Sequence, residues 1–368
     1  MEIRRLKAEE FEQAIHLSNR TFREQGHTSM GQAFPHVFSK ELQQSFGAFD
    51  GETLISFIGL VPATIRIGEA TLTVFSLGSV CTHEDYRQRG ISTNILQEIY
   101  DYINQAAASL LFVSGDRGLY MRNHCYHFGK SFKYSIGKSS INKGGYDGDI
   151  RKGQSADVFQ IDRIRQEHRV RFDSSIMEWQ ILLEAGGYAS IFKMEQALYV
   201  ASRDGVLEGY AVIGMPTPKS TKEHAIIIEW GGDPRIVYGI VQHLLENDIV
   251  LEMELTLPWH DKFRDEISEH PCEEQNNEGT IHIVDVERLI GQLMPYLYEK
   301  DPTIAQSLSV RTLDEEIVTI NHFNATEITV SLEEFVKLLF DPQSLFLGRE
   351  LQTIFPIPLP NTEGMYFV

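Results

Sequence analysis

The chain has few cysteines, more acidic than basic residues, and no long hydrophobic run. Its three cysteines, Cys81, Cys125 and Cys272, are odd in number and scattered over 368 residues, so neither a disulfide framework nor a zinc site is expected. No stretch approaches the roughly 20 apolar residues that a membrane-spanning helix needs. The first residues also lack the apolar segment of a signal peptide. We therefore expect a cytoplasmic protein that does not enter a membrane.

The charge balance bears on the partners of the protein. Lysine and arginine together number 33 against 52 aspartates and glutamates, which gives a net charge of −19. A nucleic-acid-binding protein needs a basic face, so nucleic acid is not expected as a partner. A negative field concentrates amines near the surface, although the same charge would also serve solubility alone. The composition leaves open whether the chain forms a homo-oligomer.

The most informative segment is 79–93, where a strand ends and a helix begins. The residues just before it are β-branched and apolar, as in a buried strand, and isoleucines at 91, 95, 99 and 103 then give one apolar helix face. Arg87 and Arg89 flank the junction between them, and Gly90 lets a ligand approach the backbone there. The free amides of a first helical turn favour a phosphate. The plainer alternative is a glycine turn with two solvated arginines.

The strand at 71–80 carries a second signal. Its apolar alternation changes parity, because Leu72 and Val74 give way to Phe75 and Leu77, and Gly78 follows at once. A parity break beside a glycine is typical of a β-bulge. Such a bulge would turn the backbone amides of residues 80 and 82 towards a ligand.

The segment resembles the acetyl-coenzyme A loop of the GCN5-related N-acetyltransferases (GNAT), whose pattern is Gln/Arg-x-x-Gly-x-Gly/Ala. Arg87, Gly90 and Ser92 stand at the three key positions, and Ser92 replaces the more usual glycine or alanine. The resemblance implies acetyl-coenzyme A as cofactor and no metal. The cofactor-binding residues that it implies are Val80, Cys81, Thr82, Arg87, Gln88, Arg89, Gly90, Ile91, Ser92 and Thr93.

The middle third of the chain repeats this plan of strands, loop and helix. Its corresponding loop contains Asp233 and Pro234, which suit the cap and the first position of a helix, but it has no arginine before the helix. A carboxylate there would repel a phosphate. We therefore expect a degenerate copy that binds no cofactor. A third region begins near residue 281, with short strands and a helix opened by a capping box at 331–334.

The whole plan resembles the enhanced intracellular survival (Eis)-like acetyltransferases, whose third domain is similar to sterol carrier proteins. The implied fold class is α+β (α/β), with two GNAT-like domains in tandem and a small sterol-carrier-protein-like domain. The implied boundaries are 1–150 for the catalytic domain, 151–278 for the degenerate copy and 279–368 for the C-terminal domain.

The resemblance also implies the catalytic residues. Residues 119–125 resemble the family signature Tyr-x-Arg-x-Gly-Phe/Cys: Tyr120 and Arg122 match, and His124 stands at the usual glycine. In the family this tyrosine is the general acid and the carboxylate of the last residue is the general base, which correspond to Tyr120 and Val368. A phenol near the sulfur can donate a proton as the thiol leaves.

The C-terminal tail has features of its own that fit this role. Prolines stiffen residues 355–360, and the apolar tip at 365–368 would be costly to leave in water, so we expect it to dock. An α-carboxyl group has an ordinary pKa of about 3.3–3.7 and would act chiefly by orienting or attracting the amine. His83, His124 and His127 are rival candidates for the base.

The function implied is acetyl-coenzyme A-dependent N-acetylation of a primary amine by direct attack in a ternary complex. The acceptor would be a small molecule, such as an aminoglycoside or polyamine, or a lysine side chain. One alternative is a peptide or protein N-acetyltransferase, and another is a non-catalytic sensor of coenzyme A or lipid. The acceptor itself cannot be predicted, because loops such as 26–35 would shape its pocket and contain no motif that identifies a ligand.

Overall fold

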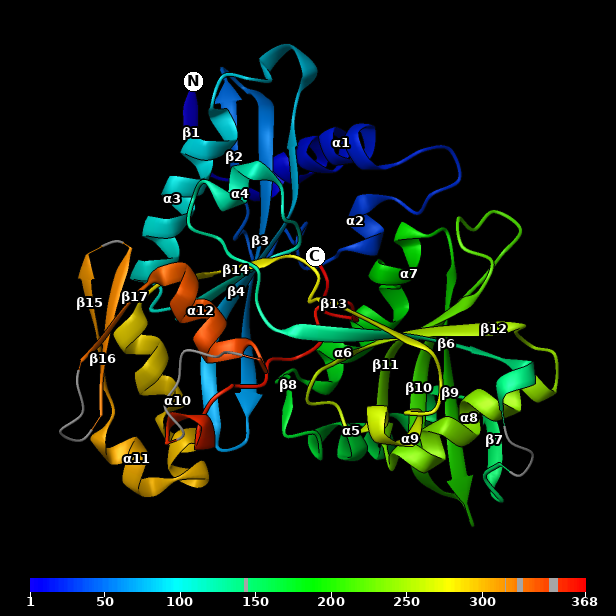
Figure 1. Ribbon diagram of the computed structural model, residues 1–368. Helices are drawn as coiled ribbons and strands as arrows, with labels where there is room; N and C mark the ends of the chain where they lie inside the picture. The colour runs from blue at the N-terminus through cyan, green and yellow to red at the C-terminus, as the bar shows by residue number, and fades with distance from the viewer. Residues whose placement is uncertain (142–144, 315, 323–326, 344–349) are drawn as a thin grey trace.

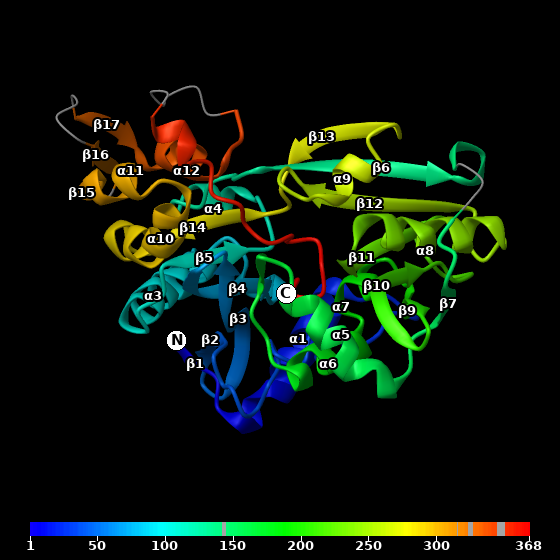
Figure 2. The same ribbon diagram turned by 90° about the horizontal axis from the view of Figure 1, so that it is seen from below.

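The computed structural model describes residues 1–141, 145–314, 316–322, 327–343 and 350–368. The described residues form a mixed α/β structure with two seven-stranded sheets and one three-stranded sheet. In Figure 1 the first sheet stands at the upper left, the second lies at the right, and the small third sheet lies at the lower left. Figure 2 shows the C-terminus between the first two sheets.

The first sheet has the order β1-β2-β3-β4-β5-β14, with β8 beside β3. Its only parallel pair is β4 with β5. The strands are β1 (Glu2–Arg5), β2 (Phe46–Asp50), β3 (Thr53–Ile67), β4 (Ala70–Thr82), β5 (Leu110–Val113), β8 (Val170–Phe172) and β14 (Thr280–Ile283). The helices of this part are α1 (Phe11–Phe22), α2 (Met30–Ala33), α3 (Ile91–Gln105) and α4 (Gly118–Met121). The predicted apolar face of α3 is confirmed, since its four isoleucines and Leu96 are buried.

Two segments differ from what their local sequence pattern predicts. Residues 6–22 have the pattern of an amphipathic helix, but the helix begins at Phe11, after a strand too short to show alternation. Residues 53–61 and 63–67 have the pattern of two strands separated by Pro62, but they form one continuous strand, β3. On one edge of β3, β2 pairs as far as Ile58 and β8 pairs from Ile65. Pro62 lies in the gap between them, where a missing amide is tolerated.

The second sheet has the order β13-β6-β12-β11-β10-β9-β7. Its strands are β6 (Lys130–Gly137), β7 (Asp149–Lys152), β9 (Glu195–Arg203), β10 (Val206–Met215), β11 (Ala225–Gly232), β12 (Glu252–Pro258) and β13 (Cys272–Asn276). Its helices are α5 (Val158–Gln166), α6 (Ile176–Ala185), α7 (Gly187–Ile191), α8 (Pro234–Glu246) and α9 (Phe263–Glu266). Asp233 caps α8 and Pro234 is its first residue, as the sequence predicted.

The third region consists of a small sheet and three helices that pack on the first sheet. Its elements are α10 (Val286–Lys300), α11 (Pro302–Ser307), β15 (Ser309–Asp314), β16 (Ile317–Asn321), β17 (Ile328–Ser331) and α12 (Leu332–Phe340). The predicted capping box of Ser331 and Glu334 is present. One hydrophobic cluster joins α10 and α12 to Leu72 of β4 and Phe112 of β5. The expected strand start at 326 lies outside the described residues.

The sheets exchange strands across the expected boundaries. β6 precedes residue 150 but pairs within the second sheet, whereas β8 and β14 pair within the first. The limits at 150 and 279 therefore do not separate the sheets. Residues 119–129 have a helix-like pattern that gives no sign of β6, but α4 ends at Met121 and β6 begins at Lys130.

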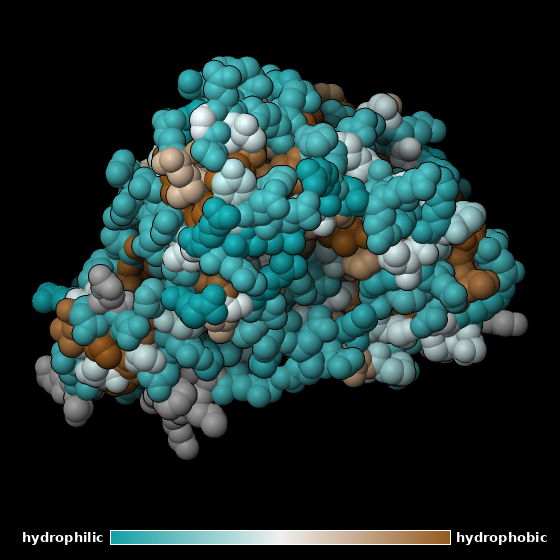
Figure 3. Space-filling view, turned by 90° about the horizontal axis from the view of Figure 1, so that it is seen from above, coloured by the Kyte–Doolittle hydropathy of each residue, from teal (hydrophilic) through white to brown (hydrophobic). Residues whose placement is uncertain are grey.

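The surface and the helices bear on the location of the protein. The face in Figure 3 is mainly hydrophilic, with hydrophobic residues in small separate patches. No helix among the described residues is long and apolar enough to cross a membrane. The cytoplasmic location stays a prediction.

Candidate active site

The parallel strands β4 and β5 form a fork. They pair from Val74 with Leu110 to Leu77 with Val113, and no further. At that point the register of β4 against β3 shifts: Gly59 faces Gly78, but Phe57 faces Cys81, so β4 carries one extra residue. The predicted β-bulge is confirmed. The pairing of β4 with β5 therefore ends next to the bulge.

The loop after β4 leads into a helix start that fits a phosphate group. Gly90 has a φ of 72°, and a Cβ atom built on it would have no atom within 4 Å, so the backbone is open to a ligand. No side chain caps the first turn of α3. Arg87 and Arg89 are exposed, and the loop backbone orients them: Arg87 Nε donates to the Thr82 carbonyl at 3.1 Å, and Arg89 Nη2 to the Asp85 carbonyl at 2.7 Å. Two cations therefore flank free helix amides, as a pyrophosphate requires.

Ser92 has a structural use at its unusual position. Its hydroxyl lies 3.0 Å from Thr82 Oγ1, which in turn lies 2.7 Å from Ser56 Oγ. This chain of hydroxyls ties the start of α3 to β4 and β3. Cys81 lies at the same strand end, but its buried thiol contacts Ser18 at 3.5 Å, and burial raises its pKa to about 11. Only the backbone of Cys81 is therefore available to a cofactor.

Tyr120 lies on α4, shortly after β5. It is buried, and a Cβ atom on Gly115 would lie 3.0 Å from its ring carbon Cε2. Its hydroxyl has no hydrogen-bond partner among the described residues. Burial raises the pKa of Tyr120 to about 12, so the phenol is protonated at neutral pH and is a proton donor.

The C-terminus lies on the bulge of β4. A Cβ atom built on Gly78 would lie 2.1 Å from a carboxylate oxygen of Val368 and 2.8 Å from Ser114 Oγ. Only glycine leaves room for the terminal carboxylate here. In Figure 1 the label C marks this point, where the first two sheets approach each other.

The last residues are held by side chains from several elements. Tyr366 stacks on Phe172 of β8 with ring centroids 4.5 Å apart. The ring of Phe367 lies 6.4 Å from that of Phe34 and 5.5 Å from that of Tyr188. The sequence indicated only that an apolar tip would dock. It could not identify these partners, because they are distant in sequence and carry no motif.

Among the cavities that tail residues line, two are lined by Val368, and a third shares residues with one of these two. Two small ones, of about 30 and 20 Å³, lie on either side of Val368, and Ser76 and Phe172 line both. A larger one of about 530 Å³ shares Phe172, Glu178 and Tyr366 with the first of them. The large cavity and the 30 Å³ cavity are therefore neighbours.

The rival histidines of the sequence analysis lie elsewhere. His83 caps a turn in the cofactor loop, and its Nδ1 accepts from the Asp85 amide at 3.4 Å. His124 Nδ1 lies 3.7 Å from Glu316 of the third region, and its φ of 57° is a conformation that the family's glycine would adopt easily. The Nδ1 of His127 is buried and has no hydrogen-bond partner in the part of the chain that the structure describes. None of the three is among the residues that line the cavities beside Val368.

The sequence analysis did not identify His36. It lines the same small cavity as Val368, and its Nε2 is buried with no hydrogen-bond partner among the described residues. Burial lowers the pKa of His36, which favours the neutral imidazole. It therefore joins the candidates for the base. Its position just after the loop 26–35 was the only available signal.

Carboxylates give these cavities a negative character. Glu178 of α6 lines the 30 Å³ and the 530 Å³ cavities, and Glu278 lines the 20 Å³ one. Burial, with the charges of Glu363 and Asp116, raises the pKa of Glu278. A cation entering this region would relieve that repulsion.

Comparisons with known proteins agree with this geometry. Residues 2–125 match the model of an acetyltransferase (GNAT) domain. A search of curated proteins found no match. Three solved structures share the fold over most of the chain. A probable N-acyltransferase from Enterococcus faecalis has a TM-score of 0.65 at 12% identity, covering 92% of this chain and 89% of that one.

The other two structures are a GCN5-related N-acetyltransferase and Eis1. A GCN5-related N-acetyltransferase from Anabaena variabilis has a TM-score of 0.64 at 12% identity, covering 97% and 96% of the two chains. Eis1 from Mycobacterium abscessus has a TM-score of 0.61 at 14% identity, covering 90% and 85%. Residues 2–125 are thus a GNAT acetyltransferase domain in a chain that resembles Eis in fold, and the protein is an N-acetyltransferase that uses acetyl-coenzyme A.

Proposed function

We propose that the protein acetylates a primary amine that binds beside the carboxylate of Val368, by direct attack in a ternary complex. The observation that carries this proposal is the position of that carboxylate on Gly78, at the bulge where the β4–β5 fork opens. Substrate and cofactor would then meet at the bulge from opposite sides.

The cofactor would lie in the fork and along the loop to α3. Arg87, Arg89 and the amides around Gly90 would hold its pyrophosphate, within the ten-residue set given above. Bound there, acetyl-coenzyme A supplies an acetyl group activated as a thioester. The backbone amides of Val80 and Thr82 would polarise the acetyl carbonyl as negative charge develops on its oxygen.

Two groups would transfer protons in the reaction, one as the base and one as the acid. Val368 would attract the ammonium form of the acceptor and receive, directly or through water, the proton that the amine must lose. As the carbon–nitrogen bond forms and the carbon–sulfur bond breaks, Tyr120 would donate its hydroxyl proton to the leaving sulfur. His36 is the alternative base, because it shares a cavity with Val368.

The acceptor proposed is cationic, because Glu178 and Glu278 line the cavities at Val368. Aminoglycosides, polyamines and lysine side chains have this chemistry. Since an extended peptide would also present a lysine, peptide or protein N-acetylation remains the second candidate. A sensor role without catalysis is the third.

The domain assignment is also part of the proposal. We assign 1–150 to the catalytic domain, 151–278 to a degenerate GNAT-like copy and 279–368 to a sterol-carrier-like domain, with strands exchanged between neighbouring sheets. The degenerate copy is supported at α8, where Asp233 Oδ1 accepts from the Arg235 amide at 2.9 Å and its carboxylate pairs with that side chain. The start of α8 is therefore already occupied by the carboxylate of Asp233.

Thiol release from acetyl-coenzyme A, measured with a panel of acceptors, tests the proposed function. The panel contains aminoglycosides, a polyamine and a lysine peptide, each matched with an analogue in which hydroxyl groups replace the amines. We expect amine-dependent release with at least one class and none with its hydroxyl analogue. Binding of acetyl-coenzyme A without release for any amine would contradict catalysis and favour the sensor.

A further inference from the structure

The second sheet contains a fork of the same construction as the first. β11 and β12 are parallel and pair from Ala225 with Met253 to Ile227 with Leu255, and no further. There the register of β11 against β10 shifts, because Ile213 faces Ile227 and Val212 faces Glu229. β11 thus carries one extra residue, Ile228, as β4 does at its own fork.

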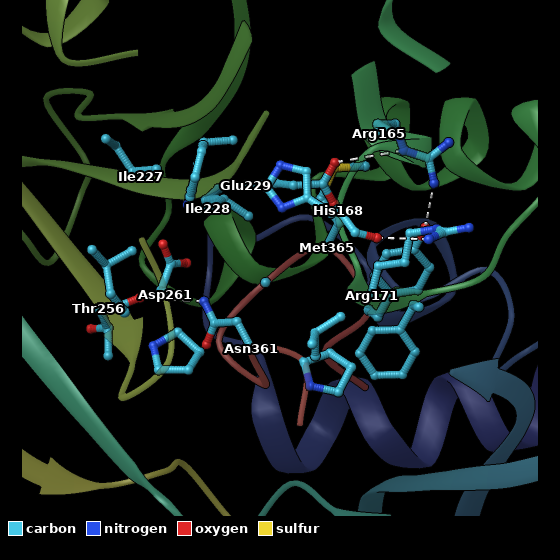
Figure 4. Close-up of a pocket in the computed structure, with 18 of the residues that line it drawn as sticks. Arg165, His168, Arg171, Ile227, Ile228, Glu229, Thr256, Asp261, Asn361 and Met365 are labelled. Carbon is cyan, nitrogen blue, oxygen red and sulfur yellow. Dashed lines mark hydrogen bonds and ion pairs between the residues drawn. The ribbon is translucent and has the colours of Figure 1, made fainter. Parts of the chain in front are cut away.

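This second fork contains the C-terminal tail. A cavity of about 120 Å³ lies between Ile228 to Trp230 of β11 and Thr256 to Pro258 of β12, and tail residues form its other wall (Figure 4). Asn361 Nδ2 donates to the Thr256 carbonyl at 3.4 Å. A Cβ atom on Gly364 would lie 3.3 Å from the Ile228 carbonyl, at the bulge itself. The tail therefore passes the bulge of β11 and ends on the bulge of β4.

Arg165 of α5 connects this fork to the tail. Its side chain is 6% exposed and lies 3.0 Å from Asp162 and 3.9 Å from Glu229 of β11. From this position Nη2 donates to the hydroxyl of Tyr366 at 3.0 Å, and also to Ser174 Oγ. In Figure 4 Arg165 lies beside Glu229, and a dashed line joins the two side chains. Tyr366 is only two residues from Val368.

We propose that the second fork is a docking site for the chain's own tail, and that Arg165 is a positioning residue that holds Val368 on Gly78. The degenerate copy would then serve the active site by placing its carboxylate. The catalytic consequence rests on the function proposed above, whereas the docking itself does not. Arg165 acts through Tyr366 and touches neither acceptor nor cofactor.

Removal of the terminal residue by carboxypeptidase A, followed by mass spectrometry, tests the docking without reference to activity. Arg165→Met should raise the rate of Val368 release at least 10-fold over the unmodified protein. Tyr366→Phe keeps the stacking on Phe172 and should raise it less. The control is Arg163→Met on the same helix, where Nη2 bonds the Leu207 carbonyl and not the tail. Unchanged release in both Arg165→Met and Tyr366→Phe would overturn the proposal.

A double-mutant cycle then separates positioning from general stability. Arg165→Met should lower kcat at least 10-fold and leave acetyl-coenzyme A affinity within two-fold, and Arg165→Lys should recover part of kcat. In a chain lacking Val368, Arg165→Met should change kcat less than two-fold. An equal loss of kcat in both backgrounds would overturn the positioning role. If deletion of Val368 alone leaves kcat unchanged, the proposed base is wrong, but the carboxypeptidase result still tests the docking.

Discussion

At Gly78 the absence of a side chain is what admits the terminal carboxylate. Because a Cβ atom there would lie 2.1 Å from an oxygen of Val368, even alanine would force the tail to move. The φ of Gly78 is not positive, so the backbone itself would accept alanine. An alanine at position 78 therefore tests a steric effect on the tail without adding backbone strain.

Gly78→Ala should lower turnover at least 10-fold and leave the affinity for acetyl-coenzyme A nearly unchanged, because only the carboxylate is displaced. Gly137→Ala is the matched strand control, since a Cβ atom there would have no atom within 4 Å. The measurements are steady-state thiol release and calorimetry. Wild-type turnover in Gly78→Ala would show that the carboxylate has no part in the reaction.

Tyr120→Phe should lower turnover by roughly 10²–10⁴, since the ring and its packing stay while the proton donor is lost. Acetyl-coenzyme A affinity should stay within about two-fold. Because burial raises the pKa of Tyr120 to about 12, its ionisation should produce no loss of kcat below about pH 11. Turnover equal to that of the unmodified enzyme would assign the proton donor elsewhere.

At the scale of elements, we propose that the strand–loop–helix unit from β4 to α3 binds the cofactor and that its counterpart from β11 to α8 does not. The two units share a parallel fork, a bulge and a helix start. They differ in the loop: one start has Gly90 and no cap, and the other is capped by Asp233. The two units therefore differ in the charge and the open space at the start of the helix, and not in their fold.

Arg87→Glu should weaken acetyl-coenzyme A binding at least 10-fold, because it replaces a cation with an anion beside the open helix start. Arg235→Glu makes the same change in the second unit and should have no effect. Calorimetry of both variants, with a stoichiometry of one in the unmodified protein, checks this. Equal affinity in Arg87→Glu, or two bound equivalents in the unmodified protein, would contradict the assignment.

β14, which joins the third region to the first sheet, should make stability depend on pH. The ring of His282 stacks on Tyr100 at 4.1 Å, and its Nδ1 donates to the His124 carbonyl at 3.0 Å. Burial lowers the pKa of His282 from 6.5 to about 4. Between those values the unfolded chain binds a proton that the folded chain does not, so stability is fully present above about pH 6.5 and falls as the pH drops towards 4.

The expected loss from His282 is on the order of 3 kcal/mol across that window. Urea unfolding at pH 6.5 and 4.5 should show a smaller difference in midpoint for His282→Asn than for the unmodified protein. The control His16→Asn replaces an exposed histidine and should behave like the unmodified protein. An unchanged pH dependence in His282→Asn would rule out this contribution.

At the scale of the whole molecule, local pattern predicted several of the elements but not which strands pair across the sheets. The bulge at Gly78, the apolar face of α3, the cap at Asp233 and the capping box at 331–334 all follow from neighbouring residues, and all are confirmed. The exchange of β6, β8 and β14 between sheets depends on pairings distant in sequence, which no local pattern records.

The residues of the candidate site likewise fall into those that local motifs predict and those that only the fold brings there. Arg87, Gly90 and Tyr120 lie in short motifs, so the sequence could point to them. Arg165, Phe172 and His36 reach the site only because the tail folds back through both forks. Their contribution depends on tertiary contacts, and a single sequence carries no sign of it.

The most direct test of this account is the effect of the chain end on turnover. Deleting Val368 removes the carboxylate from the bulge, and adding two glycines after it moves the charge away from Gly78. The account predicts that both changes lower turnover at least 10-fold in the thiol-release assay while calorimetry finds the same affinity for acetyl-coenzyme A. Turnover equal to that of the unmodified enzyme in both variants would contradict it.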